Sequence, residues 1–181
     1  MSESQSLLSV GIDVGTTTTQ VVFSRLDLSN IARTGLISRV SITGRRILYQ
    51  SPILFTPLLD QDTIDAEKLN AIVRGEYSAA GMNPQDVATG AVIITGETAK
   101  KKNADAILQS LAGLAGDFIV SIAGPNVESL IAARGSGAAR YSKEHYTTVT
   151  NVDIGGGSAN AAVFRSGNPL GGAAMNYGGR I

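Results

Sequence analysis

The chain has 181 residues, of which 43% are hydrophobic and 17% are charged, so it can bury a substantial core and lacks the composition of a disordered chain. Its 15 basic and 15 acidic residues leave no net charge, which argues against nucleic acid or an acidic membrane surface as the main partner. Because the sequence contains no cysteine, disulfides and thiolate sites are excluded, and no apolar run reaches the ~18–20 residues of a membrane span.

Three strands are predicted at the start of the chain. Residues 7–14 and 19–25 are apolar runs on either side of a turn rich in Gly and Thr, a pattern typical of a β-hairpin. Residues 36–43 alternate between apolar and polar side chains and predict a third strand. Residues 47–54 predict a further extended piece, which ends before Pro57.

Strands and helices then alternate. Asp62 or Thr63 is the expected N-cap of a helix that ends at Gly81. The elements expected after it are strands at residues 90–95 and 118–123 and helices at residues 99–114 and 127–140. Both strands are continuous apolar runs, which predicts burial on both faces, and the alternation indicates an α/β layered domain. The hairpin start argues against a Rossmann unit, whose glycines lead directly into a helix.

The most informative feature is a repeat of the first hairpin near residue 150. At an offset of 140 positions three pairs of residues match: Asp13 with Asp153, Gly15 with Gly155 and Thr18 with Ser158. A turn of glycine and small hydroxyl residues presents N–H and O–H groups to an anion, and a carboxylate at the strand end can hold a divalent cation. Two such turns predict a pair of phosphate loops facing one nucleotide.

These turns supply the candidate site residues. Asp13 and Asp153 are the expected metal-organising carboxylates, acting through water, and Asp153 is also a candidate for positioning the nucleophilic water. The residues expected to bind phosphate are Gly15, Thr16, Thr17, Thr18, Gly155, Gly156, Gly157 and Ser158. An aspartate that only stabilises its turn is the alternative for Asp13.

Glu97 is a further catalytic candidate. It follows the strand at residues 90–95, at the edge of the sheet where ligands of α/β proteins bind, and is suited to acid–base work or to holding a metal-bound water. A carboxylate that only caps a helix start explains it equally well. His145 is the only histidine, and its polar surroundings at residues 141–146 predict that it is exposed.

With both turns in place, the chain resembles the superfamily of actin, sugar-kinase and heat-shock-chaperone ATPases, in which two ribonuclease-H-like halves close over ATP. Residues 11–19 resemble its first phosphate motif, residues 152–158 its second, and residues 124–138 the helix connecting the halves. The heat-shock chaperones have a glutamate before the proline of that connection, where this chain has Gly124. Glu97 and Glu128 are the candidates to replace it.

The finer resemblance is to the ethanolamine ammonia-lyase reactivating factors of ethanolamine utilisation, through the hairpin start, residues 94–104 and the connecting helix. It implies a chaperone-like ATPase that uses ATP and Mg²⁺ to release damaged cobalamin from the lyase. It also implies a cytoplasmic protein associated with a bacterial microcompartment, with no nucleic-acid or membrane partner. A kinase for a small sugar or carboxylate, and an actin-like filament protein, are the alternatives.

The resemblance covers only the N-terminal part of such a protein. We therefore expect one nearly complete ribonuclease-H-like subdomain at residues 1–146 and the start of a second, truncated one at residues 147–181. The strands of the second part are expected to lack covering helices, which predicts self-association through exposed apolar faces and unpaired edges.

Overall fold

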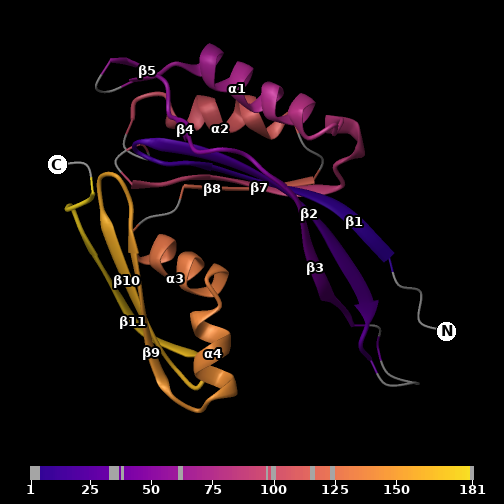
Figure 1. Ribbon diagram of the computed structural model, residues 1–181, viewed down its shortest axis with the longest axis vertical. Helices are drawn as coiled ribbons and strands as arrows, with labels where there is room; N and C mark the ends of the chain where they lie inside the picture. The colour runs from indigo at the N-terminus through magenta and orange to yellow at the C-terminus, as the bar shows by residue number, and fades with distance from the viewer. Residues whose placement is uncertain are drawn as a thin grey trace.

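A computed structural model describes residues 5–32, 37, 39–60, 63–96, 98, 101–114, 117–122 and 125–179. Two larger β-sheets organise these residues, and each carries its helices on one face (Figure 1); a third sheet consists only of the short strands β5 (Leu58–Asp60) and β6 (Thr63–Ile64). No helix in the described ranges has both the length and the apolar character needed to span a membrane.

The first sheet has the strand order β3-β2-β1-β7-β8, with the short β4 also paired to β2. Its strands are β1 (Gln5–Val14), β2 (Thr18–Asn30), β3 (Val40–Gln50), β4 (Leu54–Phe55), β7 (Thr89–Ile94) and β8 (Asp117–Ile122). β1, β2 and β3 pair antiparallel, whereas β7 is parallel to β1 and β8 is parallel to β7. The predicted hairpin and both later strands are confirmed. The two extended pieces expected at residues 36–43 and 47–54 are instead joined in one strand, β3, whose pairing with β2 continues through two irregularities.

Two helices cover one face of this sheet, α1 (Ala66–Ala79) and α2 (Ala104–Ala112) (Figure 1). The N-cap of α1 is Asp65, whose side chain accepts the Lys68 N–H at 3.0 Å, so Thr63 is not the cap; Asp62 lies outside the described residues. Thr63 belongs to β6 (Thr63–Ile64), which pairs with β5 (Leu58–Asp60) and so delays the helix start. Gly81 follows the helix with a φ of +66°, as its predicted C-terminal position requires.

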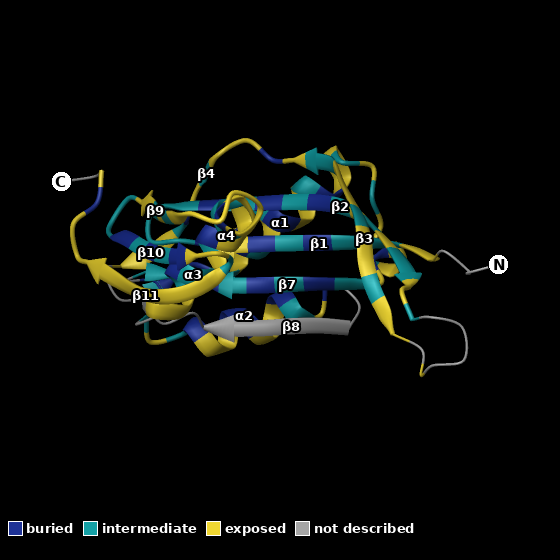
Figure 2. Cartoon of the chain, turned by 90° about the horizontal axis from the view of Figure 1, so that it is seen from below, coloured by how far each residue is buried: buried dark blue, intermediate teal, exposed yellow. Residues whose placement is uncertain are grey.

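The main core lies between this sheet and these helices. Its fully buried side chains include Ile12, Val21, Phe23, Leu69, Val73, Ile94, Ile107 and Leu111. Along β7, buried residues alternate with half-buried ones. The prediction that this strand is buried on both faces is therefore wrong. Figure 2 shows this uncovered side, where half-buried positions alternate with buried ones along β1 and β7. The physical reason is that the helices next in the chain pack against a different sheet.

The second sheet has the order β11-β10-β9 and is antiparallel throughout: β9 (Thr148–Ile154), β10 (Ala159–Arg165) and β11 (Asn168–Met175). The single helix expected at residues 127–140 is divided into α3 (Pro125–Gly135) and α4 (Ala138–Glu144), because Gly137 has a φ of +88°. Both helices pack on this sheet, around Ala133, Ala162 and Phe164. The expectation that these strands lack covering helices is therefore wrong.

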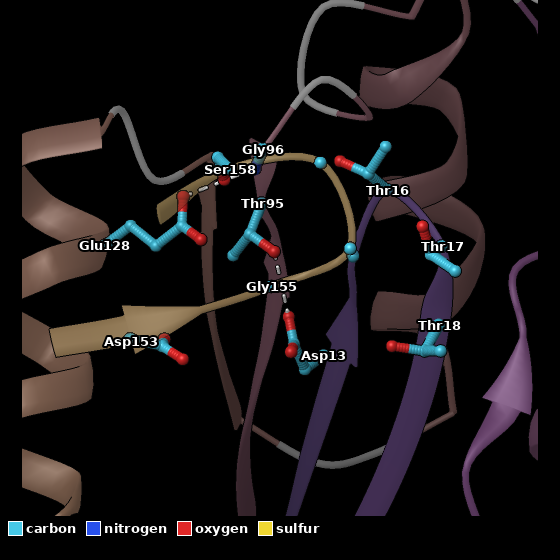
Figure 3. Close-up of a pocket in the computed structure, with 13 residues that line it drawn as sticks. Asp13, Thr16, Thr17, Thr18, Thr95, Gly96, Glu128, Asp153, Gly155 and Ser158 are labelled. Atoms are coloured by element: carbon cyan, nitrogen blue, oxygen red, sulfur yellow. Dashed lines mark hydrogen bonds between the residues drawn. The ribbon is translucent and has the colours of Figure 1, made fainter. Parts of the chain in front are cut away.

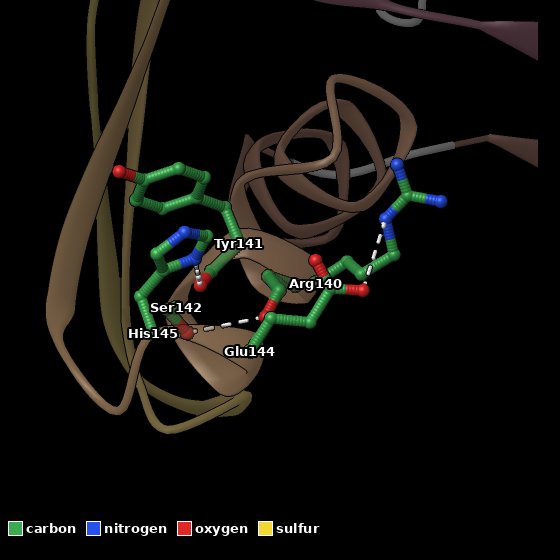
Figure 4. A network of polar contacts seen from close by, with 6 residues as sticks. Arg140, Tyr141, Ser142, Glu144 and His145 are labelled. Carbon is green, nitrogen blue, oxygen red and sulfur yellow. Dashed lines mark hydrogen bonds and ion pairs between the residues drawn. The ribbon is translucent and has the colours of Figure 1, made fainter.

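Polar contacts also tie α4 to the second sheet. The buried Ser142 hydroxyl accepts the Gly167 N–H at 2.8 Å and donates to the carbonyl of Ala139. His145 is exposed, as predicted, and stacks on Tyr141 with ring centroids 3.9 Å apart (Figure 4). A subdomain boundary at residue 146 stays a prediction, and these contacts favour a boundary before α3.

The open face of the second sheet leads to a first testable prediction. Val152, Ile154 and Met175 lie on the side away from the helices and are each at least 60% exposed. We expect a polypeptide of residues 1–181 to self-associate through this face, because apolar surface there gains from being covered. In sedimentation velocity, changing all three residues to Thr should shift the protein toward monomer, whereas Ile53→Thr, a change at an exposed site elsewhere, should not. A wild-type polypeptide that stays monomeric at every concentration contradicts the prediction.

Candidate functional site

The two predicted turns are built in the same way. In the first, the Gly15 N–H donates to the Thr18 carbonyl at 2.9 Å; in the second, the Gly155 N–H donates to the Ser158 carbonyl at 2.8 Å. The cross-strand partners keep the same offset, since Asp13 lies opposite Gln20 and Asp153 opposite Asn160. The sequence repeat is thus also a repeat of backbone hydrogen bonding.

The turns face each other at close range (Figure 3). A Cβ atom on Gly156 would collide with the Thr17 side chain, and one on Gly157 would lie 3.1 Å from Cγ2 of Thr16. A Cβ atom on Gly96, which follows β7 and has a φ of +61°, would also collide with the Thr16 hydroxyl. Only residues without a side chain allow the turn of the second sheet to approach the first so closely.

Between the turns lies a cleft of about 210 Å³. Its lining residues are Asp13, Gly15, Thr16, Thr17, Thr18, Thr95, Gly96, Glu128, Asp153, Gly155, Gly156, Gly157 and Ser158. Ten of the sequence-predicted site residues are therefore brought together, while Glu97 lies outside the described residues. Pockets that bury a whole drug-sized ligand have volumes of about 300–1,000 Å³. This cleft is smaller, and its volume suits a phosphate chain with a cation.

Hydroxyl groups beneath the first turn hold it in place. The Gly15 carbonyl accepts hydrogen bonds from the hydroxyls of Thr56, at 2.8 Å, and Thr98, at 3.0 Å. Thr56 is linked in turn to the fully buried Thr19 hydroxyl at 3.0 Å. Because these partners come from three separate segments, the turn is fixed by the tertiary structure as well as by its own residues.

Three carboxylates line the cleft: Asp13, Glu128 and Asp153. The Thr95 hydroxyl donates to Asp13 at 3.3 Å, and the Gly96 N–H donates to Glu128 at 3.3 Å. No Lys or Arg is among the described residues that line this cleft. A bound polyphosphate would therefore meet hydroxyls, backbone N–H groups and acidic side chains, and its charge requires an accompanying cation.

The surroundings raise the pKa values of two of these carboxylates, Asp13 and Glu128. Loss of hydration raises the pKa of Asp13 to about 6; the Thr95 hydrogen bond opposes this, and the charges of Glu128 and Asp153 add to it. Loss of hydration also raises the pKa of Glu128, against the hydrogen bond from Gly96 and with a contribution from Asp153. Both carboxylates therefore gain from a cation placed near them.

The donor set fits a hydrated Mg²⁺ ion. Carboxylate and hydroxyl oxygens are hard ligands of the kind Mg²⁺ prefers, and Mg²⁺ usually retains several waters while sharing phosphate oxygens. Across the part of the chain that the structure describes, no three His, Cys, Asp or Glu side chains converge into a direct metal cage. The arrangement thus suits a cation held through water and phosphate, in the manner expected for Asp13 and Asp153.

Glu128 is a cleft residue that the sequence predicts only as a replacement for a superfamily glutamate. It lies in the first turn of α3 and reaches the carboxyl end of β7. Its neighbour Asn160 is 3% exposed and donates to it, while the Asn160 side-chain oxygen has no hydrogen-bond partner. The signal that points to it is a glutamate three residues after Pro125, in the first turn of the helix that follows β8.

Comparison with known proteins gives consistent results. Residues 5–181 match the family described as ethanolamine utilisation protein EutA. The chain is 47% identical over 177 residues to proteins named ethanolamine ammonia-lyase reactivase EutA from Escherichia coli (strain K12) and from Salmonella typhimurium (strain LT2). Each match covers 98% of this chain and 38% of the relative, so the chain spans less than half the length of these curated relatives.

Solved structures agree on the fold. A Ppx/GppA family member from Aquifex aeolicus has a TM-score of 0.58 at 18% identity, over 96% of this chain and 52% of that chain. The ethanolamine utilisation protein EutJ from Carboxydothermus hydrogenoformans has a TM-score of 0.51 at 19% identity, over 97% of this chain and 53% of that chain. These likenesses confirm the predicted fold class, the actin-like and ribonuclease-H-like α/β architecture.

Proposed function

Because the chain belongs to the family of ethanolamine utilisation protein EutA, we propose that it forms the phosphate-binding part of an ATP-dependent reactivase for ethanolamine ammonia-lyase. The observation that carries the proposal is the pair of matching turns around one acidic cleft, since this geometry suits a nucleotide phosphate chain with a cation. The whole protein would use ATP to release damaged cobalamin from the inactivated lyase. Its cytoplasmic location and association with a microcompartment are part of the same proposal.

In this proposal the two turns divide the work of binding. Backbone N–H groups and the hydroxyls of Thr16, Thr17 and Ser158 bind phosphate oxygens from the two sides of the cleft. Asp13 and Asp153 hold Mg²⁺ through water, and the ion neutralises phosphate charge that no cleft-lining Lys or Arg balances among the described residues. The nucleotide is then bound only while both sheets keep their turns facing each other.

Glu128 is suited to position the attacking water. Its carboxylate lies on the α3 side of the cleft, where the Gly96 N–H fixes its orientation. The raised pKa, caused chiefly by loss of hydration, makes its carboxylate a better proton acceptor than that of an ordinary glutamate. Asp153, on β9, lines the same cleft. Its negative charge disfavours the ionised form of Glu128, and a bound cation would offset this effect.

The direct test is ATP turnover by the full-length protein, with and without cobalamin-inactivated lyase. Turnover that depends on Mg²⁺ and restored lyase activity after ATP addition are the expected results. A double change of Gly156 and Gly157 to Val should abolish both activities, because side chains there collide with Thr17 and Thr16. Changing Gly171, whose surroundings are open, to Ala is the matched control. Reactivation without any nucleotide dependence contradicts the proposal.

Asn160 provides a prediction about pH. Its amide donates to the Glu128 carboxylate and lowers the pKa of that group. Removing the amide in Asn160→Ala should raise the Glu128 pKa, so the acid limb of the pH–rate profile should move to higher pH. Single-turnover hydrolysis measured from pH 5 to pH 8 tests this. An unmoved acid limb in a folded variant shows that Asn160 only fills space.

A further inference from the structure

After the end of β11 the chain passes over the second turn of the cleft. Figure 1 shows that β11 ends at the same edge of the second sheet as the turn between β9 and β10. The Gly179 N–H donates to the Gly155 carbonyl of that turn at 2.9 Å, and Gly178 is buried beside it. We call Gly178 and Gly179 the anchor segment. Neither residue lines the cleft, so the anchor segment contacts the turn from outside.

The anchor segment lies directly against the backbone of the turn. A Cβ atom on Gly178 would collide with the carbonyl group of Gly156 and with the nitrogen of Gly157. Backbone atoms cannot rotate aside as the end of a flexible side chain can, so a side chain at position 178 must displace the turn. Gly178 does not have a positive φ. Glycine is therefore needed here for the close approach and not for an unusual backbone conformation.

The two turns are held at the same carbonyl by different donors. Gly15 and Gly155 have the same place in the repeat, and each carbonyl accepts a hydrogen bond from outside its own turn. The donors to Gly15 are side-chain hydroxyls, whereas the donor to Gly155 is the backbone N–H of Gly179. This N–H reaches the turn because the preceding residue, Gly178, passes it without a side chain. The close approach and the hydrogen bond are thus two parts of one contact.

The direction of this hydrogen bond bears on phosphate binding. The Gly155 carbonyl and the Gly156 N–H belong to one peptide group, and in a trans peptide they point in opposite directions. Because the carbonyl is directed at Gly179, the Gly156 N–H points away from the anchor segment. A carbonyl that accepts a hydrogen bond also polarises its peptide group and strengthens the N–H as a donor. Gly156 is a cleft-lining residue, so the contact orients a donor at the cleft.

We propose that the anchor segment positions the second turn for binding the phosphates of ATP. The backbone of Gly178 fixes the place of Gly156 and Gly157, and the Gly179 N–H fixes the orientation of the peptide group that ends in the Gly156 N–H. The inference rests on the proposed function, in which N–H groups of this turn bind phosphate. Gly178 and Gly179 are positioning residues, because they act on the ligand only through the turn, and binding groups must be held to within about 0.5 Å to be effective.

Calorimetric titration of the full-length protein with MgATP tests the role of Gly178. Gly178→Ala should raise the Kd about tenfold or more, because the added methyl group displaces the turn. Gly171→Ala makes the same change in β11 at a site with open surroundings and should leave the Kd unchanged. The stoichiometry of binding separates positioning from stability. A role in stability alone would lower the stoichiometry and the melting temperature and leave the Kd of the folded fraction as it is.

A second pair of variants tests the hydrogen bond. A Cβ atom on Gly179 would lie 3.8 Å from the Gly155 carbonyl oxygen, an ordinary contact distance, so Gly179→Ala adds a side chain and keeps the N–H. Gly179→Pro removes the N–H. The Kd for MgATP should be about three- to tenfold higher in Gly179→Pro than in Gly179→Ala, the effect expected for one lost hydrogen bond. This pair gives the decision if Gly178→Ala does not fold.

The possible failures can be separated. Wild-type protein that binds no MgATP overturns the proposed function, and with it this inference. Wild-type protein that binds MgATP, together with equal Kd values for Gly179→Pro and Gly179→Ala, overturns the inference alone. A Gly178→Ala variant with an unchanged Kd and a reduced stoichiometry assigns Gly178 to stability, which also overturns it.

Discussion

Glu128→Gln should slow single-turnover ATP hydrolysis by about 10²–10⁴-fold, the range expected when a positioned general base is lost. The amide keeps the shape of the side chain and loses only the ability to take a proton, so the Kd for ATP should be nearly unchanged. Rapid-quench hydrolysis beside calorimetric ATP titration separates the two effects.

Glu97→Gln is the matched comparison, since Glu97 is, with Asp153, one of the two catalytic candidates from the sequence. If Glu97 only stabilises the start of a helix, its variant should melt at a slightly lower temperature and hydrolyse ATP at the normal rate. Slow hydrolysis in Glu97→Gln together with normal hydrolysis in Glu128→Gln would reverse the two roles and contradict the proposed site.

Asp13→Asn should abolish measurable Mg²⁺-dependent nucleotide binding while stabilising the metal-free protein near neutral pH. The first effect follows because the amide removes a charge that organises the cation. The second follows from the pKa of Asp13, which is about 6 in the folded state and 3.8 as its ordinary value. The folded protein therefore holds the Asp13 proton more tightly than the unfolded chain does, and the stability from this group is lost as pH rises through about 6.

Thermal melts of the wild type and Asp13→Asn between pH 3.5 and pH 7.5 measure this difference. The variant should be the less stable of the two, or equal, near pH 4 and the more stable one near pH 7. The gain should be modest, because the Asp13 carboxylate keeps contact with solvent and is screened by it. A difference in melting temperature that does not change with pH, or unaltered ATP affinity, rules out the role given to Asp13.

Local patterns predicted the hairpins and the turns, because both depend on neighbours in sequence. The match of Gly15 with Gly155, and of Thr18 with Ser158, predicted two similar turns. The structure shows the same backbone hydrogen bond in both. The α/β class followed from the order of these elements, and the ribonuclease-H-like fold from the resemblance to a known superfamily. Such features need only the side-chain alternation of strands and the conformational freedom of glycine.

Long-range packing set the limits of what the sequence could predict. Helical periodicity gave a helix after residue 127, but nothing local says that α3 covers the second sheet instead of the first. The sequence predicted Asp62 or Thr63 as the cap of α1, but the pairing of β6 with β5 includes Thr63 and leaves Asp65 as the cap. Glu128 reaches the cleft because α3 folds back toward Gly96, 32 positions earlier in the chain.

The length of β2 has a consequence for how events in the cleft reach the surface. This strand begins at the first of the two matching turns and runs for 13 residues to Asn30, which at a rise of about 3.3 Å per residue is roughly 40 Å. A paired strand of this kind is stiff. A change in the distance between the two turns, at the start of the strand, therefore moves its whole length. A rotation of about 5° between the sheets would move the far end by roughly 3–4 Å relative to α4, at this length. In the proposed function, loss of a single phosphate group that lets the turns move apart is then transmitted to the far end of β2 without any change in the strand itself.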